Sequence, residues 1–150
     1  MKKLIPENIP DPRKYTGFLL WQKSNAWEKH VNQKLKTFNI TQSEIFQLIS
    51  LSLLLSEQQE VTQVELANFT GITAMNVSKI IKTLEQKGLI KRKTGTDSRS
   101  KALEVTENGI KILIQSAEAL VEANNTFFPS KDAENFYKYL NSLNLFSSTI

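Results

Sequence analysis

The segment from Thr62 to Gly88 constrains the fold most, because it carries start and stop signals for two short helices. Thr62 and Glu65 have the spacing of a capping box, in which each side chain satisfies a free amide at a helix start. Gly71 can adopt the positive φ of a tight turn, and Thr73 is suited to cap the helix that follows. Gly88 is suited to end that helix. We therefore expect two helices joined by a tight turn.

The expected second helix separates apolar from polar side chains. Its apolar residues recur three or four positions apart, which predicts a buried face: Val77, Ile80, Ile81 and Leu84. The other positions carry small, amide, hydroxyl and ammonium groups, which can meet base edges and phosphates in a DNA major groove. These positions are Ala74, Met75, Asn76, Ser78, Lys79 and Lys82. The pattern favours a helix-turn-helix whose second helix reads DNA.

A basic hairpin is expected after the second helix. Residues 89–93 and 102–105 are predicted to be strands around a loop at 94–100, which together would form a wing. Between 79 and 101, eight positive side chains oppose two acidic ones, a balance of +6 in a chain of net charge +4. Charged side chains are exposed by default, but this excess lies on the segment expected to read DNA. It is therefore the electrostatic pattern of a phosphate-binding face.

These features, in this order, resemble the MarR family of bacterial transcription regulators. After the helix-turn-helix come residues 84–92, then Asp97-Ser98-Arg99, then a Val-Thr-x-x-Gly exit into a helix within 103–109. The similarity covers about residues 14–126. The resemblance implies a homodimer on a pseudo-palindromic operator in double-stranded DNA. It also implies that Arg99 enters or approaches the minor groove and that Asp97 orients its guanidinium group.

The candidate contact residues follow from this resemblance and from the side chains themselves. The candidates for DNA contact are Thr62, Gln63, Thr73, Ala74, Met75, Asn76, Ser78, Lys79, Lys82, Lys91, Arg92, Lys93, Asp97, Ser98, Arg99 and Lys101. The resemblance further implies a small aromatic or lipophilic effector, bound between the dimer helices and the DNA-reading lobe. The candidates for lining that effector pocket, chosen by region, are Phe18, Trp21 and Phe46.

The rest of the chain is expected to be helical and to form the dimer. We predict a mostly α-helical single domain with a small β-hairpin wing, with the DNA-reading lobe at 41–105 and dimerisation helices at 14–40 and 106–150. A long helix at 14–38 begins apolar on nearly all sides, which a partner subunit would cover. Thr41 and Glu44 repeat the capping-box spacing, and Thr106 is suited to cap a later helix. Residues 1–13, with three of the four prolines, are expected to be an extended arm.

The sequence also bears on two other classes of function. An enzyme would need a nucleophile with a base, a metal cluster or a glycine-rich phosphate loop, yet the five glycines all stand singly. With no cysteine and a single histidine, His30, a metal or other cofactor is not expected. The alternative is a winged helix that binds an acidic protein partner. No signal peptide or membrane span is evident, so we expect a cytoplasmic protein.

Overall fold

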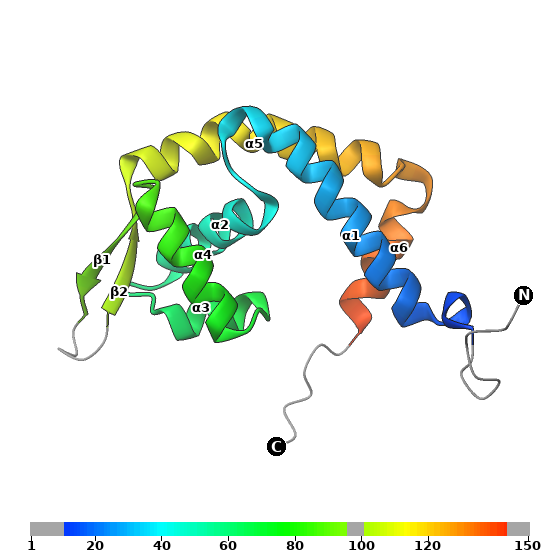
Figure 1. The fold of residues 1–150 in the computed structure, drawn as a ribbon, viewed down its shortest axis with the longest axis horizontal. Coiled ribbons are helices and arrows are strands. Elements are labelled where there is room, and N and C mark those ends of the chain that lie inside the picture. Colours follow the sequence, from blue (N-terminus) through cyan, green and yellow to red (C-terminus); the bar gives the residue numbers. More distant parts are fainter. Residues whose placement is uncertain (1–10, 96–100, 144–150) are drawn as a thin grey trace, which may run out of the picture.

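The computed structural model describes residues 11–95 and 101–143 and is mainly helical (Figure 1). Short 3-10 helices at Pro12–Lys14 and Lys36–Phe38 flank the first long helix. The helices are α1 (Thr16–Leu35), α2 (Gln42–Glu57), α3 (Gln63–Thr70), α4 (Ala74–Gln86), α5 (Glu107–Phe127) and α6 (Ser130–Ser142). The strands β1 (Ile90–Thr94) and β2 (Lys101–Val105) form one antiparallel hairpin.

The molecule has the shape of an arch (Figure 1). Helix α5 runs along its top, from the β-hairpin to α6, and packs against α1. At one end, α2, α3, α4 and the hairpin form a compact lobe, while the start of α1 and α6 form the other end. The lobe is therefore joined to the α1–α6 end by two long helices.

The lobe is held together by the apolar faces that the sequence pattern predicts. Val77, Ile81 and Leu84 of α4 are fully buried, as are Leu66 of α3 and Leu103 of β2. The core of α2 consists of Ile45, Leu48 and Leu51. Because each fully buried aliphatic side chain contributes about 1.5–3 kcal/mol, these faces fix α4 firmly against α2 and α3.

Both predicted capping boxes are present. The hydroxyl of Thr62 accepts from the Glu65 amide at 3.3 Å, and the Glu65 carboxylate accepts from the Thr62 amide at 2.7 Å. Thr41 and Glu44 make the same pair of bonds, at 3.3 and 2.8 Å. Gly71 ends α3 with a φ of 70°, a backbone conformation that favours glycine. The start and stop signals read from the sequence are confirmed.

The boundaries of three predicted elements shift by one to three residues. The first long helix begins at Thr16 and ends at Leu35, after which the chain tightens into a 3-10 turn. Leu89 is not part of β1, because its amide bonds to the Leu84 carbonyl and closes the end of α4 beyond Gly88, whose φ is 69°. Thr94 joins β1 instead of the loop.

The segment 1–13, expected to be an extended arm, is described only from residue 11. Pro12–Lys14 form a 3-10 turn, in which the Asp11 carboxylate accepts from the Arg13 amide at 3.0 Å. The expectation of fully extended chain is therefore wrong for these last residues. In the described part of the chain, no helix is long and apolar enough to cross a membrane.

Candidate nucleic-acid interface

Helix α4 presents a polar face to solvent on the side opposite its core. Thr73 caps it by accepting from the Asn76 amide at 3.4 Å. The candidates Thr73, Ala74, Met75, Asn76, Lys79 and Lys82 are exposed, and Ser78 is half-buried. Since Val77, Ile81 and Leu84 on the opposite face are fully buried and Ile80 is partly buried, the exposed face is held in one orientation. The structure thus brings the α4 candidates together on one surface.

The start of α3 lies next to the hairpin. Val61 accepts a bond from the Leu103 amide at 2.8 Å, and Thr62 forms a bridge with Ala102. The Thr62 hydroxyl also donates to the Glu65 carboxylate at 2.8 Å, so it already has a structural role as the cap of α3. Gln63 is half-buried at the same helix start. The two α3 candidates therefore lie where α3 meets β2.

The Thr62 amide is the main cause of a lowered pKa at Glu65. By donating to the carboxylate, it lowers the pKa of Glu65 below its usual value, and the Thr62 hydroxyl adds to the effect. The charged form of Glu65 is therefore favoured in the folded chain. A negative charge in the first turn also interacts favourably with the helix dipole.

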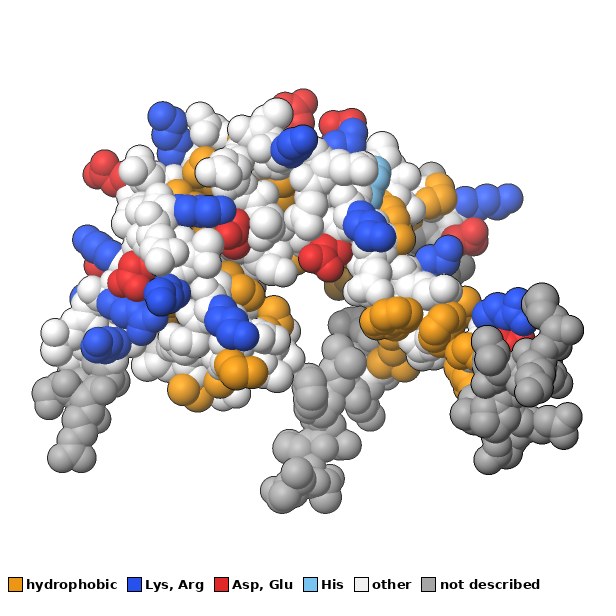
Figure 2. Space-filling view, viewed as in Figure 1, with side chains coloured by type: hydrophobic (Ala, Val, Ile, Leu, Met, Phe, Trp, Pro, Cys, Tyr) orange, Lys and Arg blue, Asp and Glu red, His pale blue; other side chains and the backbone are white. Residues whose placement is uncertain are grey.

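The hairpin carries most of its charge on β1. Lys91 lies opposite Glu104 and pairs with it at 3.2 Å, and Arg92 pairs with Glu85 of α4 at 3.3 Å. These two cations are therefore partly neutralised within the chain. Among the residues that the structure describes, Lys79, Lys82, Lys93 and Lys101 have no carboxylate partner within salt-bridge distance. Figure 2 shows Lys and Arg side chains gathered on this flank of the lobe.

Lys87 belongs to the basic segment of the sequence, but its ammonium group does not face outward with the others. It lies 2.8 Å from a Glu44 oxygen and 2.9 Å from the Asn39 carbonyl oxygen. Of the eight positive side chains counted between 79 and 101, Lys87 is therefore engaged within the lobe. Lys87 joins the end of α4 to the start of α2.

The wing tip is not part of the described chain. Asp97, Ser98 and Arg99, the candidates for minor-groove contact, lie outside the described residues. Lys93 and Lys101, which flank the tip on the two strands, are exposed. The roles of Asp97 and Arg99 stay a prediction from the family resemblance.

The effector candidates divide between two helices. Phe18 and Trp21 are neighbours on α1, with ring centroids 5.6 Å apart, and Trp21 is 60% exposed. Phe46 lies on α2 and is 39% exposed. Their role in binding an effector stays a prediction.

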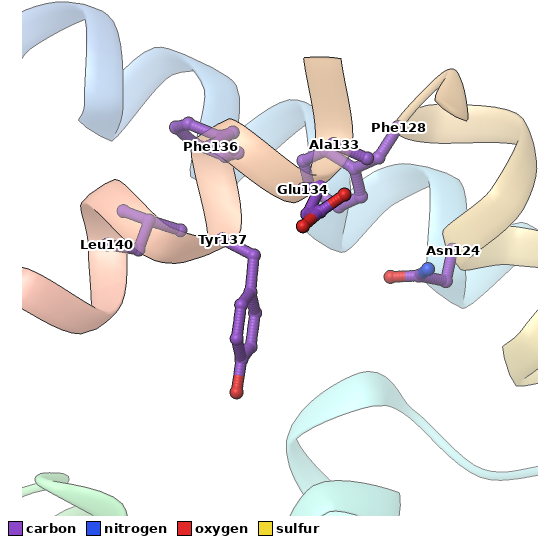
Figure 3. A pocket seen from close by; sticks show the side chains of 7 residues that line it. All are labelled: Asn124, Phe128, Ala133, Glu134, Phe136, Tyr137 and Leu140. Atoms are coloured by element: carbon purple, nitrogen blue, oxygen red, sulfur yellow. The ribbon is translucent and has the colours of Figure 1, made fainter. Parts of the chain in front are cut away.

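An apolar cavity of about 420 Å³ lies elsewhere, between α5 and α6 (Figure 3). It is lined by Asn124, Phe128, Ala133, Glu134, Phe136, Tyr137 and Leu140. Phe128 stacks on Phe136, with ring centroids 5.9 Å apart, and makes a tilted contact with Trp27 of α1, with centroids 5.2 Å apart. The volume is within the range of small-molecule sites.

The single histidine has structural neighbours. His30 lies 2.9 Å from the Thr126 hydroxyl and packs against Trp27 and Phe127. Within residues 11–95 and 101–143, no group of three metal-binding side chains comes together.

The fold and its exposed α4 face define a winged helix-turn-helix protein. The model of the MarR family matches residues 40–101, which span α2 to the start of β2. Over 134 residues, the chain is 33% identical to YdcH, an uncharacterized HTH-type transcriptional regulator of Bacillus subtilis strain 168, covering 88% of this chain and 91% of that protein. The chain belongs to the MarR family and is a DNA-binding transcriptional regulator, in a family that is not one of enzymes.

Solved structures have the same fold. The crystal structure of S. aureus MepR bound to DNA is 26% identical, with a TM-score of 0.71, and the match covers 85% of this chain and 94% of MepR. CouR from Rhodococcus jostii RHA1, solved with p-coumaroyl-CoA, is 20% identical, with a TM-score of 0.73, and the match covers 95% of this chain and 99% of CouR. At 20% identity, the similarity to CouR shows a shared fold alone.

One exposed residue near the interface was not among the sequence candidates. Val64 of α3 is 63% exposed and lines a groove between α3 and the start of α4, together with Asn68 and Ala74. The sequence did hold a signal, because an apolar residue two positions before the buried Leu66 lies on the opposite side of the helix.

Proposed function

We propose that the chain is a homodimeric repressor that works in the cytoplasm and binds a pseudo-palindromic operator. The observation that carries this proposal is the α4 face. It is rigidly backed by Val77, Ile81 and Leu84, and it exposes Lys79 and Lys82 with no carboxylate partner in the described chain. Such a helix matches the width of a major groove, and its ammonium groups can replace phosphate counterions. Repression follows if the bound dimer blocks polymerase.

The dimer is supported by apolar side chains exposed at the α1–α6 end of the arch. Leu19, Leu20 and Trp21 on α1 are 45, 47 and 60% exposed. On α6, Phe136 and Tyr137 are 39 and 68% exposed. A large exposed apolar surface marks an interaction site, and a two-fold axis lets one patch serve both subunits. The occupant we propose is a second copy, which would place two α4 helices on one duplex.

An effector would act by changing the spacing of those helices. A ligand can shift a dimer from its DNA-competent form by no more than its difference in affinity for the two forms. CouR bound to p-coumaroyl-CoA has the same fold, which supports a small aromatic effector here. The proposed site comprises Phe18, Trp21 and Phe46, and the cavity between α5 and α6 is a second location with suitable volume.

The experiment measures mass in solution and duplex binding together. Light scattering after gel filtration should give twice the chain mass of 17.1 kDa. Sites selected from a pool of random duplexes should share a two-fold motif, with half-site centres about 34 Å apart. Affinity for the selected site should fall roughly 10³–10⁵-fold between 50 and 200 mM salt, because about 6–10 phosphates are contacted. A monomer, or a protein that binds no duplex at low salt, would instead favour a winged helix that binds an acidic protein.

A further inference from the structure

The exposed face of α4 contains one large apolar side chain among its polar ones. Met75 is 66% exposed in the first turn of the helix. Lys79 lies one turn further along the same face, and Lys82 lies almost two turns further. Met75 therefore shares a face with both lysines. If Lys79 and Lys82 bind phosphates that border a groove, Met75 lies against the bases in that groove.

Two more apolar side chains lie near the start of α4. Ala74 precedes Met75 on α4, and Val64 of α3 is 63% exposed beside the groove between α3 and α4. Figure 2 shows hydrophobic side chains at the lower end of the lobe, next to the basic flank. A base edge that meets Met75 itself gains a favourable contact if it offers an apolar group.

Only one base offers such a group in the major groove. The C5-methyl of thymine is the apolar feature among the donors and acceptors of the four base pairs. The usual partner of guanine is an arginine or lysine that bonds both acceptors, but α4 contains no arginine and its lysines lie beyond the first turn. A methionine side chain is flexible and polarisable, so it can close around a methyl group.

We propose that Met75 reads the 5-methyl group of a thymine in each half-site of the operator. This inference rests on the proposed function, because it needs α4 in a major groove. It makes Met75 a specificity-determining residue, and it predicts that each selected half-site contains a fixed A·T pair opposite the start of α4. The lysines on the same face supply affinity without reading sequence.

The test replaces thymine by deoxyuridine, which removes the methyl group and keeps base pairing. In the selected operator, each thymine is replaced in turn, symmetrically in both half-sites. At one position, the substitution should weaken binding about fourfold for each half-site, the factor that corresponds to burial of one methyl group, and therefore about fifteenfold for the dimer. At the other positions, it should change little.

Variants identify the side chain responsible. Met75→Ala should bind the thymine and deoxyuridine operators equally, with an unchanged salt dependence, while Met75→Leu should keep most of the discrimination. Ile114→Ala is the control, since it also truncates an exposed apolar residue but lies on α5, outside the α4 face, and should keep the full difference. Because both residues are exposed, thermal unfolding should confirm that each variant folds.

Two kinds of failure can be told apart. If the wild-type protein binds a selected operator but ignores every thymine methyl, or if Met75→Ala keeps the deoxyuridine penalty, the inference is overturned and the proposed function stands. If the protein selects no duplex at all, both the proposed function and this inference are overturned.

Discussion

The ammonium group of Lys87, just beyond α4, lies 2.8 Å from the carboxylate of Glu44 in the first turn of α2. The side chains are only 27 and 9% exposed, so water screens this pair less than the surface pairs on the hairpin. Lys87 also donates to the Asn39 carbonyl at 2.9 Å, on the turn that leads from α1 into α2. The far end of α4 is thus tied to the junction between α1 and the lobe.

Removing one partner of this pair should destabilise the protein. Lys87→Met leaves the Glu44 carboxylate without its cation, at a cost of about 1–3 kcal/mol, and Glu44→Gln leaves a partly buried ammonium group. The free energy of unfolding in urea measures both changes. The double variant Lys87→Met/Glu44→Gln should recover part of the loss, since no charge is then left unpaired. Strictly additive losses would contradict the coupling.

The junction between the hairpin and α5 leaves no room for a side chain at Gly109. A Cβ atom built there would collide with the Leu89 carbonyl oxygen and lie 2.7 Å from Cγ1 of Val105. Gly109→Ala should therefore lower the free energy of unfolding by about 1–3 kcal/mol, the usual effect of overpacking. A chemical denaturation curve gives this difference.

A second glycine provides the matched comparison for Gly109. A Cβ atom added at Gly17 would have no other atom within 4 Å, and Gly17 lies in the first turn of α1, where alanine is the better helix former. Gly17→Ala should leave stability unchanged or raise it. A loss as large as that of Gly109→Ala would show that the steric explanation is wrong.

Local chemistry explains which parts of this fold were predictable. Caps and glycine turns act over four residues, so Thr62, Glu65 and Gly71 could be recognised directly in the sequence. The partners of charged residues depend on tertiary packing, and the pairing of Lys87 with Glu44, 43 positions away, has no local signature. The spacing of Val64 from Leu66 indicated that Val64 is exposed, but its place beside the start of α4 depends on the crossing of α3 and α4 and could not be predicted locally.

The stability contributed by Glu65 should depend on pH. Because folding lowers the pKa of this carboxyl, the charged group contributes stability above its ordinary value of 4.5, and the contribution is lost as pH falls through the lower folded value. Glu65→Gln should therefore cost about 0.5 kcal/mol at pH 7, and the difference should shrink below about pH 4. Urea unfolding at several pH values provides the measurement.

The two tryptophans can distinguish between the two candidate effector locations. Trp21 lies on the exposed start of α1, whereas Trp27 packs 5.2 Å from Phe128, a wall of the cavity between α5 and α6. A fluorescent aromatic probe, anilinonaphthalene sulfonate, should accept energy from whichever tryptophan is nearer. If it binds at the proposed site, Trp21→Phe should remove most of the transfer and Trp27→Phe should not. The opposite result would place the probe in the cavity, and absence of binding would contradict both locations.

The lysines of α4 should contribute to DNA affinity through phosphates alone. Lys79 is exposed and has no carboxylate partner among the described residues, whereas Lys91 already pairs with Glu104. Lys79→Ala should weaken binding to operator and random duplex alike and reduce the salt slope by about one for each subunit, because one phosphate contact is lost. Lys91→Ala should act in the same direction but less strongly, since its pairing with Glu104 already offsets part of its charge.

The control for Lys79 is a lysine at a distance from the lobe. Lys29→Ala makes the same change in net charge at an exposed position on α1. If charge acted only through the field of the whole molecule, Lys29→Ala and Lys79→Ala would reduce the salt slope equally. If α4 lies in the groove, the slope falls only for Lys79→Ala, because counterions are released only where an ammonium group meets a phosphate. An equal reduction in the salt slope for the two variants would show that α4 does not contact DNA.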